Sequence, residues 1–326
     1  MLEARRSEAE PPEGSALDPH VLERVVRSVT EVVRGKDEVA RLALVALLAR
    51  GHLLLEDVPG VGKTTLARAL ARAVGGDLSR IQLTADLLPV DIVGGTVLDP
   101  QTGGLHFRAG PVFAHVVLAD ELNRATPRTQ SGLLEAMAEG AVSIDGQTHA
   151  LPTPFFVIAT QNPSEHHGTY VLPQSQMDRF LFRTALGYPQ AEVERALLTG
   201  QGDPPPAPES LEPVLAPRDL PELWAAVDAV HLAGEVADYL QAIVHATRTA
   251  ADFETGVSTR GLLQFARAAR ARAMLEGRSY VSPEDVHALA VPVCAHRVVV
   301  RGHDRPSRAE VEALTRELVA GVAAPV

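Results

Sequence analysis

A glycine-rich turn, a lysine and a hydroxyl residue follow an apolar run at residues 53–65 (LLLEDVPGVGKTT). Gly60 and Gly62 allow a turn so tight that successive backbone N–H groups converge on phosphate oxygens. Lys63 then reaches the terminal phosphates, and the Thr64 hydroxyl can ligate Mg²⁺. The pattern predicts a cradle for a nucleoside triphosphate. Its expected nucleotide-binding residues are Asp57, Pro59, Gly60, Val61, Gly62, Lys63, Thr64 and Thr65.

The strict form of this motif has glycine at the position of Asp57, so the chain departs from it by one residue. An ordinary glycine turn between a strand and a helix is the alternative. The apolar run before the loop and the helical spacing of residues 64–74 after it favour phosphate binding. The motif therefore predicts an NTPase.

Two adjacent carboxylates, Asp120 and Glu121, end a second apolar run at residues 116–119. Asp120 is expected to hold Mg²⁺ through water, and Glu121 to orient and polarise an attacking water. A small-molecule kinase does not need the second carboxylate, because its acceptor hydroxyl makes the attack. The pair favours hydrolysis, and a surface Asp-Glu pair is the alternative.

A third apolar run, residues 155–160, ends in Gln161 and Asn162. Open α/β sheets bind ligands at the carboxyl ends of their strands, so Asn162 should reach the edge that carries Lys63 and the two carboxylates. There it is expected to hold the attacking water against the γ-phosphate. A plain turn between Asn162 and Pro163 is the alternative.

Composition bounds the class of protein. The 326 residues, 46% of them hydrophobic, suffice for one large or two ordinary domains. The formal charge of −11, from 30 basic and 41 acidic residues, disfavours nucleic acid as the main partner.

Cys294 is the only cysteine, which excludes an internal disulfide and a cysteine-clustered zinc site; we expect it to be buried. Apolar runs fall short of the roughly 18 residues of a membrane span, and the polar N-terminus does not resemble a signal peptide, so the cytoplasm is the expected compartment.

Strands that alternate with helices over the first 200 residues predict an α/β fold with a parallel sheet. Two β-prone segments, 94–107 and 141–151, predict hairpins inserted into this frame. The expected division is a flexible tail at 1–17, an αβα nucleotide-binding domain at 18–200, a proline-rich linker at 201–217 and an all-α domain at 218–326. The expected helices cover residues 19–35 (capped by Asp18), 36–50, 64–74, 225–232, 237–250, 258–275 and 282–296, and the expected strands 53–55, 80–83, 114–119 and 155–160.

Together these residues resemble the AAA+ ATPases, and one branch, the MoxR family, most closely. The matching stretches are 54–64 (LLEDVPGVGKT), 119–125 (ADELNRA), 130–139 (QSGLLEAMAE), 155–163 (FFVIATQNP), 168–180 (GTYVLPQSQMDRF) and 258–260 (STR). The resemblance covers about residues 33–300. Aspartate at the first loop position is what this family shows, so Asp57 supports the assignment. The resemblance implies an AAA+ P-loop αβα sandwich followed by an all-α lid.

The resemblance also implies roles at the matching positions. Lys63 and Thr64 correspond to the phosphate-loop lysine and the magnesium-binding hydroxyl. Asp120 and Glu121 correspond to the metal-binding and catalytic carboxylates, and Asn162 to the first sensor. ATP and Mg²⁺ are the implied substrate and cofactor.

Two arginines are implied to act on the nucleotide. Arg179 corresponds to an arginine finger that reaches the nucleotide of a neighbouring subunit, which requires an oligomer; a structural salt bridge is the alternative. Arg260, in the first turn of a helix capped by Ser258, matches the second sensor and is expected to contact the γ-phosphate of its own subunit. The alternative is a solvated basic face that Arg260 forms with Arg267, Arg270, Arg272 and Arg278.

Other positions carry weaker expectations. Arg124 and Arg128 are candidates for contacts at the subunit interface. His166 and His167 do not predict a metal site, because no further ligand has usable spacing. The clearest departure from the family is Gln174, where the usual residue is glutamate, so a carboxylate is missing near the expected interface.

The family resemblance implies an ATP-driven chaperone that remodels or activates other protein complexes, including by metal-cofactor insertion. It implies a homo-oligomeric ring, expected to be a hexamer, a partner with a von Willebrand factor A domain, and a client that the sequence does not name.

Two rival functions remain open. One is a nucleic-acid translocase that grips its substrate with the hairpins, although residues 94–107 and 141–151 contain no Lys or Arg. The other is a switch that binds ATP without turnover, against which stand both carboxylates, Asn162 and Arg179.

Overall fold

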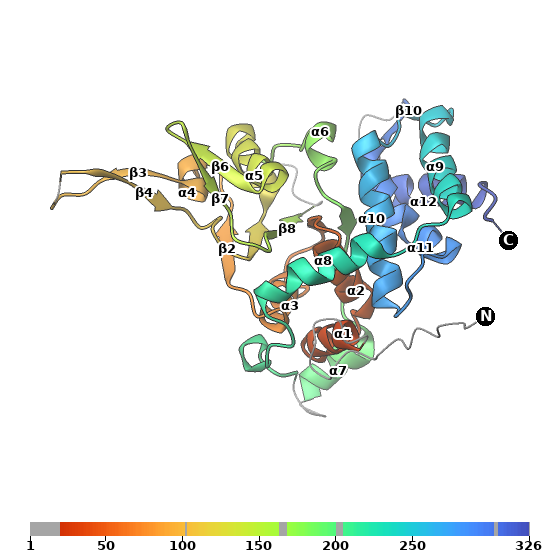
Figure 1. Cartoon of the computed structure of the whole chain (residues 1–326), viewed down its shortest axis with the longest axis horizontal. Helices are drawn as coiled ribbons and strands as arrows, with labels where there is room; N and C mark the ends of the chain where they lie inside the picture. Colours follow the sequence, from red (N-terminus) through yellow and green to blue (C-terminus); the bar gives the residue numbers. More distant parts are fainter. Residues whose placement is uncertain (1–19, 102, 163–167, 200–204, 303–305, 326) are drawn as a thin grey trace, which may run out of the picture.

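A five-stranded parallel sheet lies at the centre of the α/β part, with strand order β2-β5-β8-β1-β9 (Figure 1). The computed structural model describes residues 20–101, 103–162, 168–199, 205–302 and 306–325. The strands of the sheet are β1 (Leu53–Glu56), β2 (Leu78–Gln82), β5 (Val116–Asp120), β8 (Phe156–Gln161) and β9 (Phe182–Thr184). The predicted α/β fold with a parallel sheet is confirmed.

The central strands are covered on both faces, which explains their continuous apolar sequences. Every residue of β5 and the first five of β8 are buried, as expected for parallel strands between two helical layers. The predicted strands are found with boundaries shifted by one or two residues. Strand β9 was not predicted, because its three residues are too few to give a periodic signal.

Helices surround this sheet. Helix α1 buries one face, with Val25 and Val29 fully inside, and α5 begins at the cap Thr126, whose side chain accepts from the Thr129 N–H. The predicted cap Asp18 lies outside the described residues. The helices of this part are α1 (Val21–Val32), α2 (Asp37–Leu48), α3 (Lys63–Ala73), α4 (Pro89–Val93), α5 (Pro127–Glu139), α6 (Gln174–Met177), α7 (Ala191–Thr199) and the 3₁₀ turn η1 (Leu122–Arg124).

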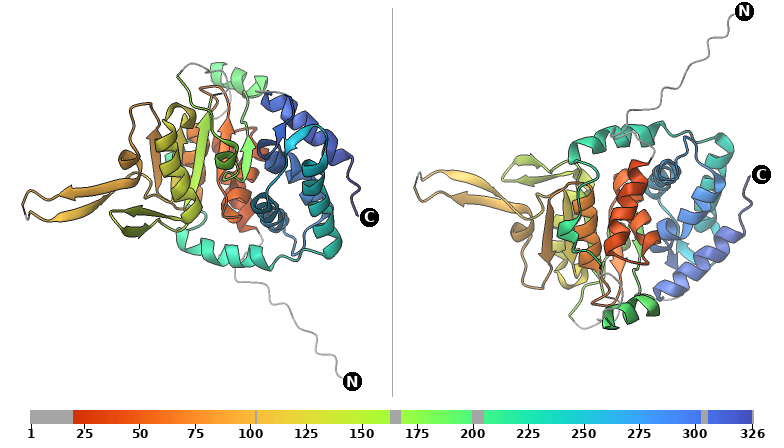
Figure 2. Two further views of the ribbon diagram at one scale, coloured as in Figure 1. Left: turned by 90° about the horizontal axis from the view of Figure 1, so that it is seen from above. Right: turned by 90° about the horizontal axis from the view of Figure 1, so that it is seen from below.

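Both predicted hairpins are confirmed, and they project on the side of the molecule away from the C-terminal helices (Figure 2). One hairpin pairs β3 (Gly94–Leu98) with β4 (Leu105–Ala109), and the other pairs β6 (Ala141–Ile144) with β7 (Gln147–Ala150). The rings of Phe107 and His149 stack at 3.8 Å between centroids, so the hairpins brace each other. Strand β4 extends past the predicted end and takes in Arg108.

The C-terminal part is helical, as predicted, with two short strands. Every helix in the described part of the chain is too short or too polar to span a bilayer. The elements are α8 (Leu220–Ala229), α9 (Gly234–Thr249), β10 (Phe253–Thr255), α10 (Thr259–Leu275), α11 (Pro283–Cys294), β11 (Val299–Val300), α12 (Arg308–Ala320) and the 3₁₀ turns η2 (Pro208–Ser210), η3 (Pro217–Asp219) and η4 (Ala295–Arg297).

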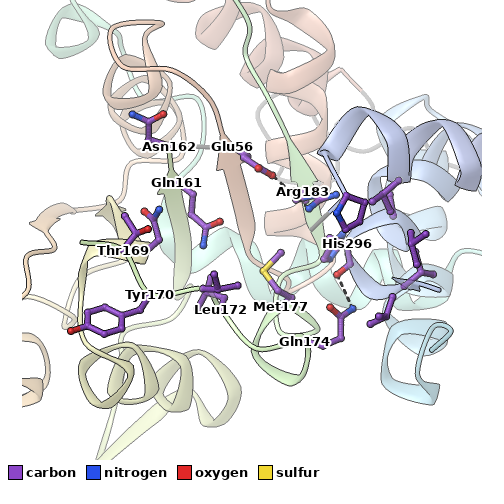
Figure 3. A pocket seen from close by; sticks show the side chains of 18 residues that line it. Glu56, Gln161, Asn162, Thr169, Tyr170, Leu172, Gln174, Met177, Arg183 and His296 are labelled. Carbon is purple, nitrogen blue, oxygen red and sulfur yellow. Dashed lines mark hydrogen bonds and ion pairs between the residues drawn. The ribbon is translucent and has the colours of Figure 1, made fainter. Parts of the chain in front are cut away.

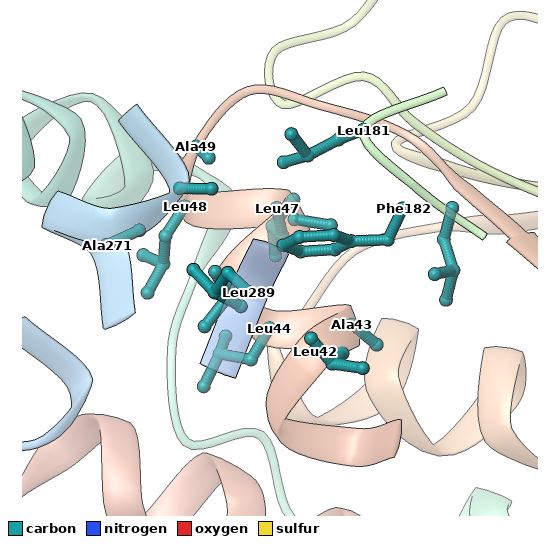
Figure 4. Close-up of a cluster of buried hydrophobic side chains, with 14 of the residues drawn as sticks. Leu42, Ala43, Leu44, Leu47, Leu48, Ala49, Leu181, Phe182, Ala271 and Leu289 are labelled. Carbon is teal, nitrogen blue, oxygen red and sulfur yellow. The ribbon is translucent and has the colours of Figure 1, made fainter. Parts of the chain in front are cut away.

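The lid packs directly on the α/β part. Figure 4 shows side chains of α2 and β9 in one apolar cluster with Leu289 of α11 and Ala271 of α10. The described residues of the proline-rich segment are not a free spacer either. Leu211 and Leu215 are buried, and the Val214 N–H donates to the Ala73 carbonyl at 2.8 Å. The expected linker therefore lies against α3.

Candidate active site at the carboxyl edge of the sheet

The loop between β1 and α3 has the backbone that the glycines predict. Gly60 and Gly62 have φ of 86° and 99°, values that favour glycine. An added Cβ would meet nothing within 4 Å at either position, so conformation and not crowding demands glycine here. Gly62 caps α3, which presents its first N–H groups and the positive end of its dipole to the loop.

The side chain of Lys63 folds back onto this loop. Its ammonium donates to the carbonyls of Asp57 at 2.8 Å and Val58 at 3.2 Å. The buried Asp57 carboxylate does not reach toward the lysine but accepts from the N–H groups of Val58 at 3.0 Å and Gly187 at 2.7 Å. Asp57 thus ties the loop to the chain that follows β9. Asp57 is not among the residues with positive φ, so its backbone conformation does not require glycine at this position.

Asp120, the last residue of β5, is buried and fully engaged. Its Oδ1 accepts from the Thr160 hydroxyl at 2.7 Å, and its Oδ2 accepts from Arg80 Nη2 at 2.7 Å and Nε at 3.1 Å. Arg80 comes from the neighbouring strand β2. These bonds hold the carboxylate at the strand end with one fixed orientation.

Glu121 stands at a sharp bend directly after β5. Its φ of 59° is left-handed, and its N–H donates to the Thr160 hydroxyl at 2.9 Å. The half-buried carboxylate accepts from the Gln82 amide at 2.8 Å and lies 3.3 Å from Arg124 Nε. Arg124 therefore pairs with Glu121 within the chain, whereas Arg128 is exposed.

Asn162 follows β8 beside the phosphate loop. Glu56 pairs with Gln161, and the next N–H along, that of Asp57, donates to the Gln161 carbonyl at 3.0 Å. Asn162 is 7% exposed. The structure thus brings Lys63, Asp120, Glu121 and Asn162 to one edge of the sheet.

Arg179 lies at the opposite end of the strands, where their amino ends meet. Phe182 of β9 pairs with Leu53, the first residue of β1, and Arg179 precedes it by three positions. Its guanidinium donates to the Leu134 carbonyl of α5. The four residues of β1 separate this edge from the phosphate loop by about 13 Å. Arg179 is therefore remote from its own loop, as a finger for a neighbouring subunit requires.

Arg260 lies on the same side as Arg179. Its helix cap Ser258 accepts from the Gly261 N–H at 3.0 Å and donates to Asp178 at 2.9 Å, beside Arg179. The exposed Arg260 side chain is two residues further on. The start of α10 therefore lies beside the segment that precedes β9, and contact of Arg260 with a γ-phosphate stays a prediction.

The alternative, a solvated basic face that Arg260 forms with four other arginines, does not fit the contacts of those four. Most of the arginines proposed for it have partners within the lid: Arg267 lies 3.6 Å from Asp228, Arg270 donates to the Val230 carbonyl at 3.1 Å, and Arg272 and Arg278 lie 3.5 and 2.7 Å from Asp285. They bind the lid helices to one another.

A buried arginine that the sequence did not single out joins the lid to the segment before β9. Arg297 has a side chain 1% exposed and donates from Nε to Asp178 at 2.9 Å. Its remaining N–H groups reach the carbonyls of Phe180, Leu181 and Val293 and the Gln264 side chain. Asp178 therefore receives both Arg297 and Ser258 of the lid.

Gln174 contacts the lid (Figure 3). Its amide donates to the His296 carbonyl at 3.0 Å. An ionised glutamate has no proton to donate, so this contact depends on the amide. Gln174 thus makes an internal hydrogen bond, and the effect of the missing carboxylate on a subunit interface stays a prediction.

Two further expectations concern metal and thiol chemistry. His166 and His167 lie outside the described residues, and within the described ones no three His, Cys, Asp or Glu side chains gather into a metal site. Cys294 is buried as predicted, and burial raises its pKa to about 12.

Sequence reasoning missed Arg80, Gln82 and Thr160, which hold the two carboxylates. Arg80 and Gln82 are two positions apart in β2, so their side chains point to the same face of the strand. Two polar residues at that spacing near the end of a strand can indicate a functional site. Which residues they contact depends on the order of the strands in the sheet. Thr160 gave no signal of its own.

The donors and acceptors at this edge fit a magnesium-bound triphosphate. Lys63, the loop amides and the start of α3 supply positive charge for phosphate oxygens, and hydroxyl and carboxylate oxygens from Thr64 and Asp120 are the ligands that Mg²⁺ prefers. Glu121 and Asn162 add a carboxylate and an amide for a water molecule.

Comparison with known proteins identifies the protein family of the chain. Residues 52–182 match a family model described as ATPase family associated with various cellular activities (AAA), and residues 245–318 match an AAA lid domain. The crystal structure of a candidate ATPase from Cytophaga hutchinsonii superposes with a TM-score of 0.81 at 33% identity, over 93% of each chain.

Two relatives match the chain over most of its length. The chain is 45% identical to the uncharacterized protein YeaC of Bacillus subtilis, over 94% of this chain and 95% of that protein. It is 43% identical to chaperone MoxR1 of Mycobacterium tuberculosis, over 88% of this chain and 78% of that protein. Fold, loop geometry and this similarity over nearly the whole length show that the chain belongs to the MoxR family of AAA+ ATPases.

Proposed function

We propose that this chain hydrolyses ATP in the cytoplasm and uses the energy to remodel or activate other protein complexes. The observation that supports hydrolysis is the meeting of Lys63, Asp120, Glu121 and Asn162 at one sheet edge, where a triphosphate and a water molecule can be held together. The relative named as a chaperone supports the remodelling role.

Each residue has a distinct task in this proposal. Lys63 and the N–H groups of the loop bind the phosphates, and Thr64 with Asp120 holds Mg²⁺, which offsets phosphate charge. Asn162 positions the water and Glu121 accepts its proton. Glu121 must exchange its bonds to Gln82 and Arg124 for that water, so these two contacts describe a resting arrangement.

Completion of the site requires a second copy of the chain. Arg179 lies about one strand length from its own loop, at the other end of the strands, and the cap of the helix that carries Arg260 contacts Asp178 beside it. In a homo-oligomeric ring, which we propose to be a hexamer, that edge faces the nucleotide of the next subunit. Both arginines then stabilise charge on a phosphate bound by the neighbour.

The site is tested by Glu121→Gln, an isosteric change that removes only the base. This variant should bind ATP with affinity close to wild type and lose hydrolysis, measured as phosphate release. Turnover near the wild-type rate would contradict the role of Glu121.

Action in trans is tested by mixing variants. Arg179→Ala and Glu121→Gln should each be inactive alone, because each lacks one half of a composite site. Mixed assemblies should regain part of the activity where a Glu121→Gln subunit supplies its arginine to an Arg179→Ala neighbour. No recovery at any mixing ratio would rule out a finger in trans.

Partners are the remaining part of the proposal. We propose a protein with a von Willebrand factor A domain as the adaptor, and maturation of a client complex, including metal-cofactor insertion, as the outcome. The Glu121→Gln variant arrests the ATP-bound assembly, so affinity capture with it should retain such partners. Their absence, with the ATPase intact, would limit the proposal to hydrolysis.

A nucleic-acid translocase is the second candidate function, favoured only by the projecting hairpins. Arg108 is the sole Lys or Arg in β3, β4, β6 and β7, so the hairpins offer little charge to a phosphate backbone. DNA should leave the ATPase rate unchanged. Stimulation that weakens with salt would reverse the choice, and ATP binding without turnover would instead indicate a switch.

A further inference from the structure

Arg80 lies in β2, the strand at one edge of the sheet, and contacts the carboxylate of Asp120 in the neighbouring strand β5 (Figure 1). The strand register pairs Arg80 with Leu118 and Gln82 with Asp120, so the Arg80 side chain runs along the strands to reach that carboxylate. The side chain of Arg80 is 50% exposed, whereas that of Asp120 is 11% exposed. Water is therefore available to the guanidinium, and burial does not force this contact on Arg80.

The contacts of Asp120 leave little of its carboxylate free. An ionised carboxylate has about four acceptor sites, two on each oxygen. Arg80 donates to Oδ2 from Nη2 at 2.7 Å and from Nε at 3.1 Å, and the Thr160 hydroxyl donates to Oδ1 at 2.7 Å. Both sites of Oδ2 are thus used by Arg80, and a single site on Oδ1 remains. The charge of Arg80 also opposes a divalent cation placed at this carboxylate.

Arg80 acts on the second carboxylate through Gln82. Arg80 Nη2 donates to Gln82 Oε1 at 3.3 Å, and Gln82 Nε2 donates to Glu121 Oε2 at 2.8 Å. Because the amide oxygen of Gln82 accepts from Arg80, its NH₂ group is the one that faces Glu121. Arg80 therefore directs hydrogen-bond donors to both carboxylates, to Asp120 itself and to Glu121 through the amide.

We propose that Arg80 is a positioning residue that keeps the two carboxylates from binding a divalent cation before a nucleotide is bound. Without nucleotide, the cation meets one free site on Asp120 and the positive charge of Arg80. A bound triphosphate supplies further oxygen ligands and the negative charge that offsets Arg80. The chain should then take up Mg²⁺ together with the nucleotide and not ahead of it. This inference rests on the proposed ATPase function, because it takes Asp120 as the metal-binding carboxylate of that site.

The test is Mn²⁺ binding to nucleotide-free protein, followed by electron paramagnetic resonance, since Mn²⁺ accepts the same oxygen ligands as Mg²⁺. Arg80→Gln removes the charge and keeps an amide donor. It should bind Mn²⁺ at least roughly ten-fold tighter than the wild type, the lower end of the effect of one nearby charge on a carboxylate, because Arg80 is half-exposed.

The sign of the change separates this role from a structural one. If Arg80 only supported the sheet, its loss would misplace Asp120 and weaken Mn²⁺ binding or leave it unchanged. Equal or weaker affinity in Arg80→Gln, or no Mn²⁺ binding by this variant at millimolar concentrations, would overturn the proposal. Arg80→Met removes the donors as well as the charge and provides a second measurement of the same change.

Three further variants locate the effect. Arg108→Gln makes the same charge change on the exposed hairpin strand β4 and should keep the wild-type affinity for Mn²⁺. Arg80→Lys keeps the charge and should also stay close to the wild type. Asp120→Asn, added to Arg80→Gln, should abolish the gain, because the carboxylate that Arg80 released is then gone. A gain in Arg108→Gln, or one that survives Asp120→Asn, would refute the assignment to Arg80 and Asp120.

Failure of this inference is separable from failure of the ATPase proposal. The Mn²⁺ titration contains no nucleotide, and phosphate release by the wild type is measured by itself. ATP hydrolysis by a chain whose Arg80→Gln variant gains no Mn²⁺ affinity would count against the role of Arg80 alone. A gain in Mn²⁺ affinity without any hydrolysis by the wild type would count against the ATPase proposal alone.

Discussion

Replacement of Asp178 by alanine should destabilise the protein strongly, because it leaves Arg297 without its carboxylate. The Arg297 side chain is 1% exposed and that of Asp178 is 18% exposed. Burial lowers the pKa of Arg297, and Asp178 is the largest of the groups that oppose this effect. Removing one partner of a buried ion pair costs roughly 3–5 kcal/mol. We expect Asp178→Ala to lower the free energy of unfolding by that amount.

A matched control separates burial from distance. Asp228 approaches Arg50 to 2.5 Å, closer than the 2.9 Å of the buried pair, but these side chains are 43% and 38% exposed. Asp228→Ala should cost less than about 1 kcal/mol. The assay is urea unfolding followed by the fluorescence of Trp224, which donates to the Leu47 carbonyl and so reports the contact between α8 and α2. Equal decreases in the free energy of unfolding in the two variants would show that burial does not determine how much each ion pair contributes to stability.

Three further outcomes can be measured. Gly62→Ala should weaken ATP binding five-fold or more in a fluorescent-nucleotide titration, because a φ of 99° costs a non-glycine residue roughly 1–3 kcal/mol; Gly234→Ala, where an added Cβ also meets nothing, is the control. Burial lowers the pKa of His52 from 6.5 to about 4, so its stabilisation is full above pH 6.5 and about 3 kcal/mol of it is lost as the pH falls toward 4. Unfolding curves of His52→Gln should lack that part of the pH dependence, and identical pH profiles would disprove it. Cys294, with its pKa near 12, should resist a thiol reagent at pH 8 in the native chain and react once urea unfolds it.

Features whose chemistry is local can be predicted from the sequence alone. Residues 57–65 carry the loop in one continuous stretch, and Asp120 and Asn162 each end an apolar run, so the parallel-sheet rule was enough to bring them together. The cap Ser258 was readable for the same reason. Each of these features is encoded within a few residues of itself.

Features that depend on residues far apart in the chain become visible only in the folded structure. The Asp57 carboxylate binds Gly187, 130 residues away, and Asp178 binds Arg297, 119 residues away. The position of Ser258 beside Asp178 follows from how the lid packs on α2 and β9, and spacing along the chain contains no record of that packing. The sequence therefore specified which groups perform the chemistry at the loop. The fold determined at which end of the strands Arg179 lies and where Asp178 meets Arg297, because those positions are set by contacts between segments far apart in the chain.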